Sequence, residues 1–153
     1  MSRFELLVPP PIVMFVTGLL MWLLSVLFPA LLLVWLHKPV FGIITGVFGV
    51  VVSLMGVLVF KRLRTPTDPR HPTASSKLAT SGVYRYSRNP MYLGVLLMLV
   101  GWTFMLGNLL SALGPLAFIV YITRLQILPE ERWLEKKFGS DFQAYKDKVR
   151  RWI

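Results

Sequence analysis

The chain has 153 residues, is 55% hydrophobic, carries a net charge of +10 and contains no cysteine. With a mean hydropathy of +0.62, this composition is typical of a membrane protein rather than of a soluble globule, and the missing cysteines exclude disulfides and thiolate metal sites. The two histidines, His37 and His71, lie far apart in sequence, so we expect no metal. The basic residues flank apolar runs, which favours membrane lipids over nucleic acid as partners.

The first half of the chain predicts two membrane-spanning helices. No charged residue occurs from Leu6 to Leu36 or from Val40 to Phe60, and each run is long enough to cross a bilayer core, which takes roughly 20 residues. We expect spans at about 10–36 and 40–60, which form an antiparallel pair. Pro29 is predicted to kink the first span or end it early.

Glycines mark one face of the second span. Gly42, Gly46 and Gly49 are spaced four and three residues apart, and Gly56 follows. Small residues at this spacing share a helix face and favour close contact with another helix in a membrane.

The second half predicts a helical hairpin. From Met91 to Thr123 there are 33 residues without charge, about 50 Å as one helix, which is too long for one ordinary span. Gly107 and Asn108 in the middle indicate a turn, so we expect spans at about 90–106 and 109–128.

The remaining segments are predicted to lie on one side of the membrane. Segment 61–89 contains a stretch rich in Pro, Thr and Ser and is typical of an exposed loop, and segment 129–153 predicts short amphipathic cytoplasmic helices divided at Gly139. With four spans, every basic residue except Lys38 lies on the side of this loop, which makes that side cytoplasmic. We therefore expect a single all-α integral membrane domain, residues 1–153, with both termini cytoplasmic, in the inner or plasma membrane if the protein is bacterial.

Polar, basic and aromatic residues crowd where the third span is predicted to begin. The stretch is GVYRYSRNPMYLG, from Gly82 to Gly94. Asn89 is expected to cap the helix and Pro90 to start it. The free helix amides, with Arg85 and Arg88 just upstream, would attract a carboxylate or phosphate.

Aromatic and acidic residues belong to the same layer. Tyr84, Tyr86 and Tyr92 suit either stacking on a planar ligand or anchoring at the membrane interface. Glu130 and Glu131 come directly after the fourth span. They are either solvated acids favoured by a helix dipole or members of a site with the Asn89 corner.

The two motifs together resemble a known family. GVYRYSRNPMYLG, a hydrophobic hairpin and then EExxLxxxFGxxFxxYxxxVxRW are similar to the integral-membrane methyltransferases grouped with isoprenylcysteine carboxyl methyltransferases and phosphatidylethanolamine methyltransferases. The resemblance covers about Leu78 to Trp152, and Asn89 stands where the eukaryotic prenylcysteine enzymes tend to have histidine. It implies S-adenosylmethionine as the methyl donor and a lipophilic carboxylate, thiol or amine as the acceptor.

Residue roles come from this resemblance by position. It implies donor binding by seven residues: Tyr84, Asn89, Pro90, Tyr92, Gly94, Glu131 and Tyr145. It implies catalytic roles for Arg151 and Arg85, which would suit an acidic acceptor group. Glu130 would be the base for an amine acceptor, although either neighbouring glutamate suits that role or donor binding.

Two alternatives from other classes stay open. One is an NADPH-dependent membrane reductase of related architecture. The other is a non-catalytic membrane protein whose basic and aromatic cluster binds anionic lipid. The oligomeric state and the identity of the acceptor have no signal in the sequence.

Overall fold

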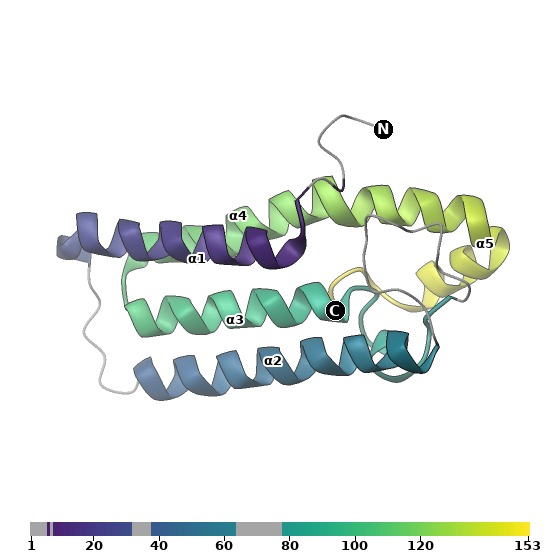
Figure 1. Cartoon of the computed structure of the whole chain (residues 1–153), viewed down its shortest axis with the longest axis horizontal. Helices are drawn as coiled ribbons and strands as arrows, with labels where there is room; N and C mark the ends of the chain where they lie inside the picture. Colours follow the sequence, from purple (N-terminus) through teal and green to yellow (C-terminus); the bar gives the residue numbers. More distant parts are fainter. Residues whose placement is uncertain (1–5, 7, 32–37, 64–77) are drawn as a thin grey trace.

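The computed structural model describes residues 6, 8–31, 38–63 and 78–153, which form helices joined by turns (Figure 1). Within these ranges the chain has no β-strand. The longer helices are α1 (Pro10–Leu27), α2 (Lys38–Arg62), α3 (Pro90–Leu106), α4 (Leu113–Ile122) and α5 (Leu128–Lys148). The shorter ones are the 3-10 turns η1 (Pro29–Leu31), η3 (Gly82–Arg85) and η4 (Leu109–Ala112) and the π-helical turn η5 (Thr123–Ile127).

The helices are apolar enough for a membrane. Three stretches have the length and composition to cross one, namely Pro10–Leu27, Pro39–Arg62 and Leu109–Lys148, and α3 is a shorter apolar helix. Large side chains such as Phe15 and Phe48 are 71% and 58% exposed. Such surfaces are stable against lipid, so the prediction of an all-helical integral membrane protein agrees with three to four apolar helices.

The first helix is shorter than predicted. We expected a span over about 10–36, but α1 ends at Leu27 and Pro29 begins the turn η1. Proline has no amide donor and clashes with the preceding turn of a helix, which explains this early end. Residues 32–36 of the predicted span lie outside the described residues.

Helix α3 lies between α2 and α1 (Figure 1). The sequence predicts an antiparallel pair of the first two spans, but α2 packs mainly along α3. A Cβ built on Gly49 would lie 2.5 Å from the carbonyl oxygen of Gly94, and one on Gly101 would lie 2.6 Å from that of Gly42. The glycines thus let the two backbones touch, and the predicted glycine face of the second span meets the third span.

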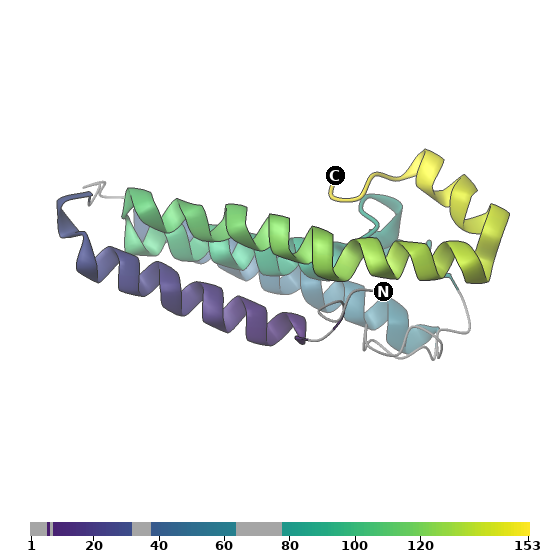
Figure 2. The same ribbon diagram turned by 90° about the horizontal axis from the view of Figure 1, so that it is seen from above.

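Helices α4 and α5 form one long rod that passes through η5 (Figure 2). The predicted helices after residue 128 therefore begin as a continuation of the fourth span. The rod breaks at Gly139, whose φ of 49° and ψ of −119° are not helical. Glycine adopts a positive φ without steric cost, so it is suited to this bend.

The hairpin turn lies where Gly107 and Asn108 predict it. Gly107 closes α3 with a φ of 58°. The Asn108 side chain accepts a hydrogen bond from the Leu110 amide at 2.9 Å and donates one to the Phe28 carbonyl, also at 2.9 Å. This asparagine thereby joins the ends of α1 and α3.

Candidate functional site

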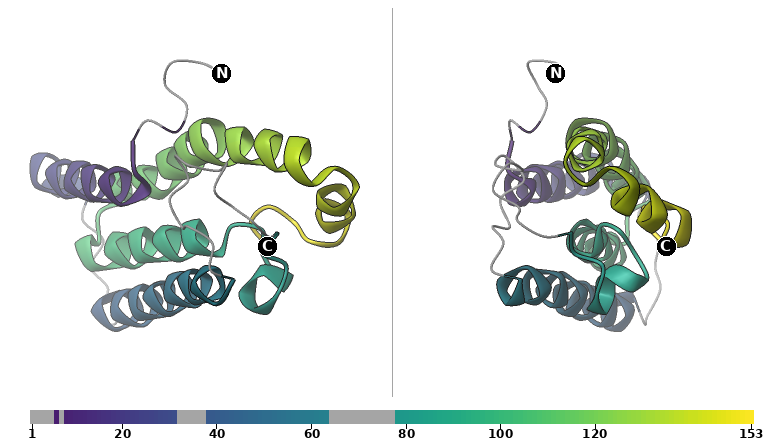
Figure 3. Two further views of the ribbon diagram at one scale, coloured as in Figure 1. Left: turned by 45° about the vertical axis from the view of Figure 1, so that its right-hand side comes forward. Right: turned by 90° about the vertical axis from the view of Figure 1, so that its right-hand side faces the viewer.

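The C-terminal segment returns from the bend at Gly139 to the start of α3 (Figure 3). The Arg88 amide donates to the carbonyl of Arg150 at 3.0 Å. The Asn89 side chain donates through Nδ2 to the carbonyl of Arg151 at 3.0 Å, and the Ser87 hydroxyl donates to the same oxygen at 3.4 Å. The last residues of the chain are therefore fixed across the N-terminal end of a membrane helix.

Glu131 is the centre of an ion-pair network at this junction. Its Oε1 accepts from Arg88 Nη2 at 2.7 Å, and its Oε2 accepts from Arg151 Nη2 at 2.7 Å. Arg151 Nε adds a bond of 3.1 Å to Oε1. Arg88 Nη1 also donates to the carbonyl of Val149 at 2.7 Å. One carboxylate thus connects the start of α3, the rod and the C-terminal segment.

The charged groups of this ion-pair network are largely shielded from solvent. Burial would raise the pKa of Glu131, but hydrogen bonds and positive charge from Arg151 and Arg88 outweigh it and lower the pKa below its usual range. The hydrogen bond to Glu131 raises the pKa of Arg151. Both shifts favour the charged forms of Glu131 and Arg151, and two arginines facing one carboxylate leave an excess positive charge. Arg88 Nε is buried and has no hydrogen-bond partner among the described residues.

Glu130 is in a different environment from its neighbour. Its Oε1 accepts a hydrogen bond from the Tyr92 hydroxyl at 2.6 Å. Part of the side chain is accessible, yet burial of the carboxyl group raises its pKa to about 7, against the lowering effect of the Tyr92 bond. Two adjacent carboxyl groups therefore have pKa values on opposite sides of the usual range, which is typical of acid–base pairs in active sites.

Two buried tyrosines, Tyr84 and Tyr145, contact each other just before the start of α3. The Tyr145 hydroxyl donates to the backbone carbonyl of Tyr84 at 2.7 Å. The ring of Tyr84 lies 5.5 Å from that of Phe60 at the end of α2. Burial raises the pKa of both tyrosines, so both phenols remain neutral.

The structure brings together most of the residues that the sequence singles out. The hydrogen-bonded layer at the start of α3 contains Asn89, Tyr92, Glu130, Glu131 and Arg151.

Asn89 and Pro90 differ in how far they follow the prediction. Asn89 occupies the N-cap position of α3, but its side chain makes no capping bond, so this part of the prediction is wrong. The side-chain amide of Asn89 donates instead to the backbone carbonyl of Arg151 in the C-terminal segment. Pro90 is the first helical residue, as expected.

Arg85 and Gly94 lie away from this layer. Arg85 is exposed at the end of η3. A Cβ on Gly94 would meet Ser53 N of α2 at 2.6 Å, so this glycine serves close packing of two helices. The ligand roles that the resemblance implies for Arg85 and Gly94 stay predictions.

Arg88 is a residue of this site whose role the sequence does not predict. Its sequence context predicts only an added positive charge that would attract an anion, but its guanidinium is already paired with Glu131. The arginine directly before Asn-Pro and the Glu-Glu pair after an apolar run are the sequence signals that could have indicated this ion pair. Nothing in the sequence shows that the chain bends back at Gly139 far enough to close the pair.

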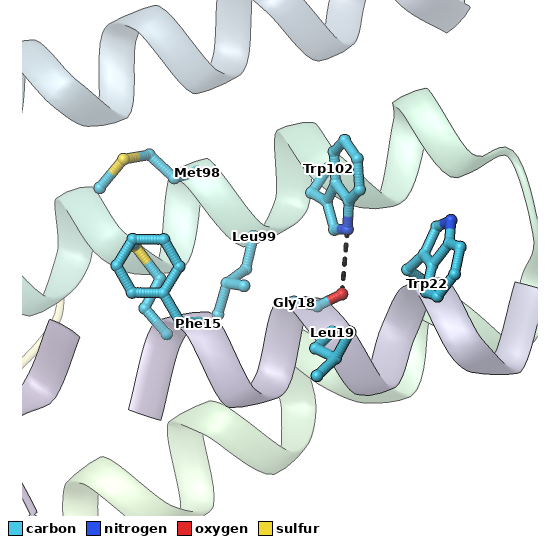
Figure 4. Close-up of a pocket in the computed structure, with 8 residues that line it drawn as sticks. Phe15, Gly18, Leu19, Trp22, Met98, Leu99 and Trp102 are labelled. Atoms are coloured by element: carbon cyan, nitrogen blue, oxygen red, sulfur yellow. Dashed lines mark hydrogen bonds between the residues drawn. The ribbon is translucent and has the colours of Figure 1, made fainter. Parts of the chain in front are cut away.

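An apolar groove lies between α1 and α3, away from the charged layer (Figure 4). Its volume is about 440 Å³. The lining residues are Met14, Phe15, Gly18, Leu19, Trp22, Met98, Leu99 and Trp102. Trp102 Nε1 donates to the carbonyl of Gly18 at 3.2 Å, so the polar atom of this indole is satisfied, and the lining is mainly apolar.

Known proteins resemble this chain over much of its length. It is 34% identical over 128 residues to the probable protein-S-isoprenylcysteine O-methyltransferases of Oryza sativa, covering 82% of this chain and 65% of the relative. It is 33% identical over 72 residues to the protein-S-isoprenylcysteine O-methyltransferase of Schizosaccharomyces pombe, covering 47% of this chain and 30% of the relative. The chain thus spans less than two thirds of the length of these relatives.

Two further comparisons bear on the class of the protein. The chain is 52% identical over 63 residues to an uncharacterized protein of Haemophilus influenzae, covering 41% of this chain and 100% of the relative. The model of the phospholipid methyltransferase family matches residues 37–141. No solved structure matches the chain significantly.

The chain thus has relatives named as isoprenylcysteine methyltransferases, matches a family of phospholipid methyltransferases, and has apolar helices long enough to cross a membrane among its described residues. The matched segment contains the start of α3, the hairpin and the Glu130–Glu131 pair. The chain belongs to the phospholipid methyltransferase family.

Proposed function

We propose that the protein transfers a methyl group from S-adenosylmethionine to a lipophilic acceptor at the membrane surface. The observation that carries this proposal is that the adjacent Glu130 and Glu131 are bonded to Tyr92 and Arg88 at the start of α3, in a chain that belongs to a methyltransferase family. We place both chain termini and this layer on the cytoplasmic side, where the polar donor is available.

The residues of this layer fit the polar groups of the donor. S-adenosylmethionine carries a carboxylate, an ammonium, ribose hydroxyls and a sulfonium. The buried Arg88 Nε has no hydrogen-bond partner among the described residues. Its N–H is suited to donate a hydrogen bond to the carboxylate of S-adenosylmethionine. The carboxylates of Glu130 and Glu131 suit the ammonium and hydroxyl groups. Bound there, the sulfonium would supply an activated methyl group to an aligned nucleophile.

The protein's contribution to catalysis is alignment and proton transfer. A displacement at a methyl carbon depends mainly on holding nucleophile and carbon in line, and such positioning can supply several kcal/mol, roughly 7–11 in well-oriented intramolecular reactions. A thiol or amine acceptor must also lose a proton. With a pKa of about 7, the Glu130 carboxylate is able to accept it. The Tyr92 hydroxyl holds that carboxylate in place.

The acceptor is a lipophilic carboxylate, thiol or amine. Relatives named as isoprenylcysteine methyltransferases favour a carboxylate on a prenyl chain. The groove between α1 and α3 has the apolar lining and the volume for such a hydrocarbon chain. Arg151 and Arg85 are the residues we propose for contact with an acidic acceptor group.

The test is calorimetric titration of the detergent-purified protein with S-adenosylhomocysteine, with NADPH as comparator. We expect saturable heat with the first ligand and none with the second. The Glu131→Gln variant should lose most of that heat, whereas Glu135→Gln, at an exposed glutamate that pairs with Lys146, should bind normally. Saturable heat with NADPH alone would support the reductase alternative and refute this proposal.

A further inference from the structure

The π-helical turn η5 interrupts the rod just before the two glutamates. A π-turn widens the helix and changes which backbone groups are bonded, and such turns are frequent at functional sites. Here the carbonyl of Leu125 accepts a hydrogen bond from the amide of Leu6, in the segment that precedes α1, at 3.0 Å. The turn is therefore tied to a separate part of the chain.

Gln126 in this turn presents a free acceptor in the protein interior. The residue is 1% exposed, and its Nε2 donates to the carbonyl of Val8 at 2.8 Å. Because a carbonyl accepts hydrogen bonds and cannot donate, this contact fixes which end of the amide is nitrogen. The other end, Oε1, is buried and has no partner among the described residues.

Thr123 repeats the pattern one turn earlier. Its Oγ1 is buried and also lacks a hydrogen-bond partner within the described ranges. Leaving such a group unpaired costs about 1–3 kcal/mol, whereas leucine or valine would cost nothing of this kind. The neighbours Ile122 and Ile127 are apolar core residues, so this part of the helix also accommodates side chains without polar groups. Two unpaired polar groups three residues apart therefore favour a ligand over packing as their explanation.

The position of these groups relates them to the proposed chemistry. Gln126 precedes Glu130 by four residues on the same rod, a rise of about 6 Å along the helix axis. Glu130 in turn holds the Tyr92 hydroxyl of α3. An acceptor whose reacting atom lies near Glu130 would extend toward Gln126.

We propose that Gln126 and Thr123 form a polar subsite that accepts a hydrogen bond from an N–H or O–H group of the methyl acceptor. This inference rests on the proposed methyltransferase function. Since Gln126 Oε1 can only accept, the matching group of the acceptor must donate. The Val8 carbonyl keeps Gln126 Nε2 occupied, so Oε1 is the end of the amide that is available to a ligand.

Cysteine labelling tests whether ligands reach the subsite, because the chain has no native cysteine. We expect Thr123→Cys in folded protein to react with methyl methanethiosulfonate. The matched control is Ser111→Cys, at a residue that is 0% exposed and bonded through its hydroxyl to the Asn108 carbonyl. The control should react only after denaturation. Equal protection of the two cysteines in the folded protein would overturn the proposal.

Two matched probes test what the subsite recognises. Dodecanol and its methyl ether share a chain and differ by one O–H donor. Dodecanol should protect Thr123→Cys about tenfold better than the ether does, the effect of one hydrogen bond to a buried group. Gln126→Leu in the same background should remove that preference, with retained S-adenosylhomocysteine binding as the check of folding. Equal protection by the two probes overturns the subsite, whereas absent donor binding in the wild type overturns the proposed function instead.

Discussion

Replacing Arg88 by methionine should release the C-terminal segment from the start of α3. The change removes the bonds to Glu131 and to the carbonyl of Val149, while the aliphatic part of the side chain is kept. Both Arg88 and Glu131 are only 10% exposed. Breaking a buried pair costs about 3–5 kcal/mol. Arg151 is 33% exposed and still pairs with Glu131, so we expect the lower value, about 3 kcal/mol.

A buried cysteine can report this release. Val149, 9% exposed, packs in a cluster with Phe142 and Tyr145, and Val149→Cys would be the single thiol of the chain. A loss of about 3 kcal/mol corresponds to roughly a hundredfold rise in the labelling rate if labelling follows local opening. Arg85→Met, at an exposed arginine of the same motif, is the control and should leave the rate unchanged. Equal rates in the two variants would refute the bridging role of Arg88.

Three further predictions concern pH, packing and topology. Burial raises the pKa of Glu130 from 4.5 to about 7. The folded state therefore binds more protons than the unfolded state between these two pH values. The contribution of Glu130 to the free energy of unfolding is full below pH 4.5 and is lost as the pH rises through 7. Thermal denaturation should show this loss, and Glu130→Gln should remove it. Gly94→Ala should destabilise the protein by about 1–3 kcal/mol through overpacking against α2, whereas Gly46→Ala, where an added Cβ meets nothing within 4 Å, should be neutral in the same assay. A cysteine at Leu109, which is 57% exposed, should be labelled only from outside the cell; labelling from the cytoplasm would contradict the proposed orientation.

Hydropathy and turn residues predict the helices well. The run from Met91 to Thr123 is too long for one span, and the structure turns at Gly107 and Asn108, where a left-handed glycine and a bonded amide reverse the chain. The helical pairing was less predictable. The glycine face of the second span indicates close packing but does not name its partner, and α3 meets it because Gly94 and Gly101 are spaced to match.

The residues of the site were predictable one by one, but their connections were not. Glu130 and Glu131 are adjacent in sequence and would be equivalent as solvated acids. Their different pKa values arise from partners that are distant in the chain, Tyr92 for the first and Arg88 for the second. Sequence also gives no sign of the π-turn over Thr123–Ile127, since residues of these types occur equally in an ordinary helix.

The continuous rod of α4 and α5 has a mechanical consequence. The same rod exposes apolar side chains in α4 and carries Glu130 and Glu131 further on, and its backbone stays helical through η5 as far as Gly139. Helices adjust their tilt to the thickness of the surrounding bilayer. A tilt of the rod relative to α3 would move Glu130 and Glu131 away from Tyr92 and Arg88, so the geometry of the site would depend on bilayer thickness.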